Sequence, residues 1–175
     1  MAYIQFLGAA GTVTGSKHLI NTGDVAGKSG FQALIDCGLF QGPKEWRERN
    51  WSDTPVPAKE IDAVILTHAH LDHCGWIPRL VKEGFRGPIY ATPPTIDLCG
   101  IILPDSGHLQ EEDAKFYNKM KKSKHDPALP LYTFEEAQDA LQYFKPVQVG
   151  DTVKLSLLRG SLTVEVSVTL TGRTN

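Results

Sequence analysis

Three histidines and one aspartate fall within six consecutive positions, His68 to His73, in the stretch "THAHLDHCGW". The whole chain has 6 histidines, so half of them lie in this one segment. Neutral imidazole and carboxylate are good ligands for zinc and similar divalent metals. We expect His68 and His70 to reach one metal ion while Asp72 and His73 reach a second. Two metal ions about 3.5 to 4 Å apart stabilise the attacking and leaving oxygens during hydrolysis. The spacing therefore predicts a dinuclear hydrolase.

A buried strand is expected to lead into this cluster. The segment "IDAVILTH" (61–68) is a short apolar run rich in β-branched residues, which is typical of a strand covered on both faces. After the cluster, "GWIPRLVKEG" (75–84) predicts a short helix that Gly84 ends, and "PIYAT" (88–92) predicts another strand. The cluster is thus expected in a loop at the carboxyl end of a strand, within a β–loop–α–β unit.

The other segments predict strands near both ends of the chain and helices between them. Strands are expected over 3–9, 16–23 and 31–38 as a meander, and over 151–170 as a pair about a turn at 159–161. Helices are expected over 95–103, 108–124 and 133–144. The last of these opens on Thr133 and Glu136, which have the spacing of a capping box. We find no repeat, no low-complexity block and no linker, which predicts a single domain.

Composition excludes several classes of protein. Of the 175 residues, 41% are hydrophobic and 22% are charged, as in ordinary globular proteins. The 3 cysteines form no C-x-x-C pair, which argues against a disulfide framework and a thiolate zinc site. No apolar run is long enough to span a bilayer, and the N-terminus lacks a basic region before its apolar part, so we expect a cytoplasmic protein without membrane contact. The net charge of -2 gives no attraction to nucleic acid.

Three segments carry a resemblance to a known family. "HAHLDH" matches the H-x-H-x-D-H motif of the metallo-β-lactamase fold superfamily, and "THAHLDHCGWIPRL" resembles the version in its β-CASP branch, the RNA-processing nucleases. "GAAGTVTGSKHLI" (8–20) and "LIDCGLFQG" (34–42) resemble two further segments of that branch. The resemblance covers residues 3–152, whereas 153–175 diverges. It implies an α+β fold, the αββα sandwich of the superfamily, truncated here to its N-terminal half.

The resemblance also implies roles for individual residues. His68 and His70 would bind the first zinc ion, and Asp72 and His73 the second. Asp36, the family aspartate of "LIDCG", would orient a ligand histidine without binding metal itself. Asp72 would be the catalytic residue, linked to activation of the attacking water and to proton transfer to the leaving group. The implied function is that of a dizinc ribonuclease, which hydrolyses phosphodiester bonds and has RNA as its partner.

The sequence also departs from the family. The superfamily completes its site with a further histidine in a "G-H-x-x-G-S"-like motif, a bridging aspartate and a late histidine, and the branch adds a cap domain. No histidine follows His125. We therefore interpret residues 1–175 as a partial domain without the cap, either truncated or produced by a frame disruption near 155–160. We expect a partial zinc site and inactive or impaired catalysis, which His18, His108 and His125 do not rescue.

Two other functions stay open. The first is a metallohydrolase with a small substrate such as a thioester or lactone, against which the helices after Tyr90 and the "VTGS" turn count. The second is a catalytically dead fragment that acts as an interaction module. Half a sandwich exposes an apolar sheet face, so we also expect a homodimer or aggregation unless something covers that face.

Overall fold

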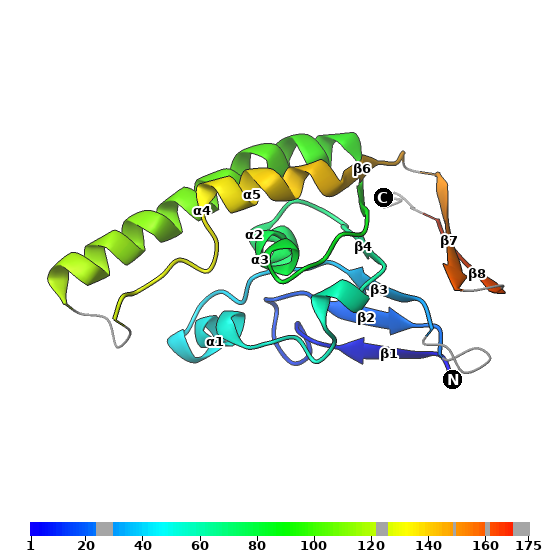
Figure 1. Cartoon of the computed structure of the whole chain (residues 1–175), viewed down its shortest axis with the longest axis horizontal. Helices are drawn as coiled ribbons and strands as arrows, with labels where there is room; N and C mark the ends of the chain where they lie inside the picture. The colour runs from blue at the N-terminus through cyan, green and yellow to red at the C-terminus, as the bar shows by residue number, and fades with distance from the viewer. Residues whose placement is uncertain (24–29, 122–125, 149, 160–161, 170–175) are drawn as a thin grey trace.

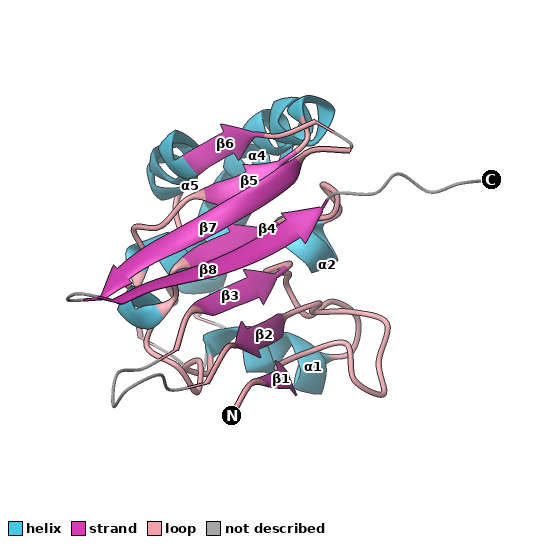
Figure 2. Ribbon diagram, turned by 90° about the vertical axis from the view of Figure 1, so that its right-hand side faces the viewer, coloured by secondary structure: helices cyan, strands magenta, loops and turns pink. Residues whose placement is uncertain are grey.

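A mixed sheet with helices on one face and a two-stranded hairpin on the other forms the body of the chain (Figures 1 and 2). The structure is a computed structural model, and it describes residues 1–23, 30–121, 126–148, 150–159 and 162–169. The main sheet has 6 strands in the order β1-β2-β3-β4-β5-β6. They are β1 (Tyr3–Phe6), β2 (His18–Asn21), β3 (Gln32–Ile35), β4 (Ala63–Ile65), β5 (Ile89–Ala91) and β6 (Phe144–Pro146).

The direction of the strands decides where the polar segments meet. The pairs β1/β2 and β2/β3 are antiparallel, which confirms the predicted meander. The pairs β3/β4, β4/β5 and β5/β6 are parallel. Because neighbouring parallel strands end at the same edge of a sheet, the chain leaves β3 and β4 side by side. Asp36 follows β3 directly and Thr67 and His68 follow β4, so this edge brings the "LIDCG" segment to the histidine cluster.

Helices cover the face of the sheet from which most of the core is built. They are α1 (Lys44–Glu48), α2 (Leu71–Cys74), α3 (Ile77–Lys82), α4 (Pro93–Met120) and α5 (Phe134–Ala140), with 3₁₀ turns at Arg49–Trp51, Ala58–Glu60 and Leu141–Tyr143. In Figure 1, α4 and α5 run side by side, with α2 and α3 between them and the sheet. Val64, Leu66 and Ile89 from the sheet pack with Trp76 and Leu80 from the helical layer, all of them buried.

The opposite face of the sheet meets the hairpin of β7 (Thr152–Arg159) and β8 (Leu162–Thr169), which pair antiparallel. Phe31, Ala33, Ala63 and Ile65 form a second buried cluster on that face, and Val168 of β8 packs against it. Figure 2 shows the hairpin lying across this face. All three residues of β4 are buried, which confirms a strand covered on both sides. Part of the apolar face that was expected to stay open is therefore covered within the chain.

The region after β5 differs from the prediction of two helices, 95–103 and 108–124. A single helix of 28 residues, α4, runs through it with Pro104 inside. A proline in a helix interior removes one hydrogen bond and normally favours a break. Here Pro104 is buried, and α4 packs closely on the start of α5: a Cβ atom at Gly107 would lie 2.6 Å from the Thr133 carbonyl oxygen. We attribute the continuous helix to this packing, which outweighs the local preference.

The predicted helix 133–144 is also shorter than expected. Its capping box is confirmed, since the Glu136 amide donates to Thr133 Oγ1 over 3.1 Å and the Thr133 amide donates to Glu136 Oε2 over 2.9 Å. The helix ends at Ala140, however, and residues 144–146 form β6, parallel to β5 at the edge of the sheet. Its Pro146 lacks a backbone donor, which an edge strand tolerates but which hid the strand from sequence reasoning.

Candidate metal centre

The histidine cluster lies where β4 ends and α2 begins. His70 is the N-cap residue of α2, a helix of four residues (Leu71–Cys74) where the sequence predicted a loop. His68, Asp72 and His73 are half-buried and His70 is exposed, so the side chains form a surface site open to solvent. Cys74, the next residue, is fully buried, and its contact with Cys99, followed by burial, raises the pKa of its thiol.

Backbone hydrogen bonds fasten the cluster to the segment that follows β3. The Cys37 amide donates to the His73 carbonyl over 2.7 Å, and the Ser16 amide donates to the Asp72 carbonyl over 2.8 Å. A Cβ atom at Gly38 would lie 1.7 Å from the Asp72 carbonyl oxygen, so only glycine allows the two segments to come this close. The positions of Asp72 and His73 are therefore set by the fold and not by the short helix alone.

The four predicted ligands come together as two neighbouring pairs. His68 Nε2 lies 3.1 Å from His70 Nδ1, and His73 Nε2 lies 3.7 Å from Asp72 Oδ2. The ring centroids of His68 and His73 are 3.9 Å apart, which links the pairs. Within the described ranges, no group of three or more His, Cys, Asp or Glu side chains is arranged to hold a metal ion. The geometry thus pairs the donors without closing them around a common point.

Asp36 is the buried acceptor that orients this cluster. Its backbone has a φ of 59° and its carboxylate accepts hydrogen bonds from His73 Nδ1 (2.7 Å), Thr67 Oγ1 (2.8 Å), the Thr67 amide (2.9 Å) and Ser16 Oγ (3.2 Å). The bond to Nδ1 leaves Nε2 of His73 facing Asp72. Sequence reasoning missed Ser16 and Thr67 as partners of Asp36, although both lie within segments that carried the family resemblance.

Thr67 orients the first histidine in the same way. Its hydroxyl has one hydrogen and contacts Asp36, so Nδ1 of His68, 3.0 Å from Thr67 Oγ1, is the donor in that contact. Nε2 of His68 is then unprotonated, so it accepts the 3.1 Å hydrogen bond from His70 Nδ1 and is the ring atom that would bind a metal. Burial, followed by the charges of His73 and His70, lowers the pKa of His68. This favours the neutral ring, which is the form that binds metal.

The donor set fits zinc chemically. With zinc to nitrogen distances of about 2.0 to 2.1 Å, two nitrogen ligands of one tetrahedral zinc ion lie about 3.3 Å apart. The 3.1 Å between His68 Nε2 and His70 Nδ1 is close to that value. Each of His68 and His73 also has its other ring nitrogen held by a neighbour, as is usual for metal-binding histidines.

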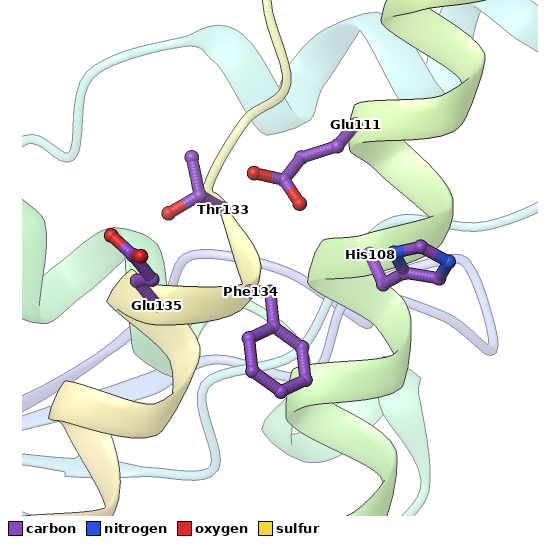
Figure 3. Close-up of a pocket in the computed structure, with 5 residues that line it drawn as sticks. All are labelled: His108, Glu111, Thr133, Phe134 and Glu135. Atoms are coloured by element: carbon purple, nitrogen blue, oxygen red, sulfur yellow. The ribbon is translucent and has the colours of Figure 1, made fainter.

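The remaining histidines lie elsewhere. The His18 ring in β2 packs edge-on against Phe6 with centroids 5.2 Å apart. His108, expected near a helix start, lies in the middle of α4 and lines a groove with residues of α5 (Figure 3). Its ring points away from the carboxylates of Glu111 and Glu135 in that view. His125 lies outside the described residues.

Comparison with known proteins identifies the family. A sequence model of the metallo-β-lactamase superfamily matches residues 22–94, which include Asp36 and the whole histidine cluster. The chain belongs to the metallo-β-lactamase superfamily. The predicted fold class is confirmed as a mixed α/β metallo-β-lactamase-like fold that is partial relative to full-length structures. Within the described residues, no helix is long and apolar enough to cross a membrane.

Relatives within the superfamily confirm the resemblance to its β-CASP RNA-processing branch. Ribonuclease TTHA0252 of Thermus thermophilus is 39% identical over 151 residues, which are 86% of this chain and 29% of the relative. Transcription termination factor FttA of Methanocaldococcus jannaschii is 31% identical, over 87% of this chain and 21% of the relative. The chain thus spans less than a third of either relative. Among solved structures, the metallo-β-lactamase BJP-1 of Bradyrhizobium japonicum is 18% identical with a TM-score of 0.44, over 97% of this chain and 60% of that one.

Proposed function

We propose that this chain carries the zinc-binding segment of a hydrolase that cleaves RNA phosphodiester bonds. In this proposal His68 and His70 hold one zinc ion, and Asp72 and His73 hold a second. The observation that carries it is the pairing of His68 Nε2 with His70 Nδ1 at 3.1 Å, next to His73 held by Asp36 at 2.7 Å. The relative named a ribonuclease, 39% identical over 86% of the chain, supports RNA as the substrate class.

Each residue has a separate task in this proposal. Bound zinc supplies the Lewis acid that polarises the phosphate and activates water. Asp36 accepts the hydrogen bond from Nδ1 of His73, which keeps that nitrogen protonated and leaves Nε2 of the same ring available to a metal. Thr67 does the same for His68 through the 3.0 Å contact to Nδ1. Asp72, half-buried at the first turn of α2, is the proposed catalytic residue, because its carboxylate opens to solvent beside His73. There it would accept the proton of the attacking water and pass it to the leaving oxygen.

The proposal is tested by cleavage of RNA by the 175-residue chain. A labelled single-stranded RNA and a DNA of the same sequence are incubated with the zinc-loaded protein and with an Asp72→Asn/His73→Ala variant. We expect slow, zinc-dependent cleavage of RNA that falls by at least about 100-fold in the variant, as for loss of a general acid or a metal ligand. Slow turnover is expected because no histidine follows His125 to complete the family site.

One control variant and two further assays separate this proposal from the alternative functions. An Asp97→Asn/His18→Ala variant changes the same residue types at an exposed position of α4 and in β2, and should retain the cleavage. RNA cleavage that both variants retain equally would contradict the assignment of the site. Hydrolysis of a thioester or lactone without RNA cleavage would favour a small substrate. Zinc binding without hydrolysis of any of these substrates would favour an interaction module.

A further inference from the structure

A second, smaller cavity of about 150 Å³ lies beside the 3₁₀ turn Arg49–Trp51 and shares no lining residue with the histidine cluster. Aromatic, basic and hydroxyl side chains line it. The residues that matter here are Lys17, Phe40, Arg49, Ser52, Asp53 and Trp76. Lys17 belongs to the segment "GSKHLI" that leads into β2, and Trp76 precedes α3. Neither the motif nor the proposed zinc site uses this cavity.

Lys17 is unusual because it is a nearly buried lysine that lines the cavity and whose ammonium group forms no ion pair within the described residues. The residue is only 4% exposed, and within the described ranges no hydrogen bond or ion pair joins Nζ to another residue. Because no fully buried side-chain nitrogen or oxygen of these ranges lacks a partner, Nζ keeps some accessible surface. Nζ lies 4.3 Å from the centre of the Trp76 ring and 5.2 Å from that of Phe40. Aromatic faces stabilise a cation but accept few of its hydrogen bonds. A nearly buried ammonium group normally pairs with a carboxylate or with several acceptors. Because Lys17 has no such partner within the described residues, its three N–H donors are available to a ligand.

A second cation adds to the positive charge of the same cavity. The guanidinium carbon of Arg49 lies 4.2 Å from the centre of the Phe40 ring, and Arg49 lines the cavity with Lys17. Burial, together with the charge of Arg49, lowers the pKa of Lys17 from 10.5 to about 8, whereas Cys37 and Glu83 act in the opposite direction. Asp53 is the acidic residue among those that line the cavity and it is exposed. Two cations against one carboxylate leave a net positive cavity.

We propose that this cavity binds one phosphate group, either as the free ion or as the terminal phosphate of a small monoester. Lys17 and Arg49 supply the charge and most of the donors, and the Ser52 hydroxyl, which has no hydrogen bond within the described residues, supplies another. The cavity is smaller than the roughly 300 to 1,000 Å³ of sites that enclose whole small molecules. Only the phosphate of a larger ligand therefore enters it. The inference is independent of the proposed RNA cleavage.

Isothermal titration calorimetry tests this site. Inorganic phosphate is titrated into the 175-residue chain at pH 7 and constant ionic strength, with EDTA present so that no metal at the histidine cluster contributes. Adenosine 5′-monophosphate is titrated in the same way. We expect saturable binding of inorganic phosphate that weakens by at least about tenfold in Lys17→Met, as expected for loss of a hydrogen bond to a charged group. Equal binding of the monophosphate assigns the site to monoesters, and its absence assigns the site to the free ion.

Two further variants make the result specific. Arg49→Gln should weaken phosphate binding while leaving the buried Lys17 in place. Lys59→Met removes an exposed lysine from the 3₁₀ turn Ala58–Glu60 and should leave binding unchanged. No saturable binding, or binding that Lys17→Met retains at full strength, would overturn the proposal.

Discussion

The Asp36→Ala chain is expected to lose about 3 to 5 kcal/mol of its free energy of unfolding, together with most of its zinc affinity. The Asp36 carboxylate is only 3% exposed and accepts hydrogen bonds from Ser16, Thr67 and His73. Alanine leaves the buried Ser16 hydroxyl and the half-buried His73 ring without this acceptor, whereas the exposed Thr67 can donate to water; each unsatisfied buried donor costs about 1 to 3 kcal/mol. The loss of the 2.7 Å bond to His73 also releases the orientation of that ring, which typically costs about 10 to 100-fold in metal affinity.

Urea unfolding and a zinc competition titration measure the two effects. Asp36→Asn keeps the shape and one acceptor oxygen, so it should be less destabilised than Asp36→Ala while its zinc affinity still falls. Asp97→Ala, at an exposed position of α4, is the matched control and should change neither quantity. An Asp36→Ala chain as stable as the Asp97→Ala chain, or with full zinc affinity, would show that Asp36 does not hold the cluster together.

Lys17→Met should stabilise the chain by up to about 3 kcal/mol at neutral pH, and this gain should disappear as the pH rises. Burial lowers the pKa of Lys17 from 10.5 to about 8, a difference worth about 3 kcal/mol. Between these values the unfolded chain holds the proton that the folded chain has released, so the stability of the natural chain rises with pH. Below pH 8 the folded chain bears the full cost of burying the charged Lys17 ammonium, and above pH 10.5 this cost is absent. Contacts with Trp76 and Phe40 offset part of it.

The difference between the two chains is measured by urea unfolding from pH 7 to 10.5. Other groups titrate in this range, including Cys37, whose pKa burial raises to about 12. Because both chains contain Cys37, most of its contribution cancels in the difference. The Lys59→Met chain, which loses an exposed lysine, should have the same free energy of unfolding as the natural chain at every pH. A difference in the free energy of unfolding between the Lys17→Met chain and the natural chain that stays constant with pH would contradict the lowered pKa of Lys17.

Sequence reasoning predicted the strands more reliably than the helices. The period and β-branched content of 61–68 sufficed for β4, whose burial on both faces is confirmed. The break expected in α4 and the missed strand β6 have one cause: both depend on contacts with segments far away in the chain. Pro104 is tolerated where α4 packs on α5, and β6 is defined by its pairing with β5. A local sequence pattern carries no information about the packing of α4 on α5 or about the pairing of β6 with β5.

The candidate site shows the same division between local and distant information. The four donors His68, His70, Asp72 and His73 are close in sequence, so their spacing alone placed them together. The approach of Asp36 required the parallel pairing of β3 and β4, and it came only from the family resemblance. Lys17 gave no signal at all, because a lysine becomes unusual only when the Phe40 and Trp76 side chains enclose it.

The number of zinc ions bound per chain decides whether the histidine cluster is a metal centre. The purified 175-residue chain is loaded with zinc, dialysed and measured by elemental analysis beside a His68→Ala/His70→Ala variant and a His18→Ala control. Zinc held by the natural chain and the control, and lost from the double variant, is the result predicted by the paired donors at 3.1 Å. A natural chain that retains no zinc, or a double variant that retains as much, would contradict the assignment of the cluster as a metal centre.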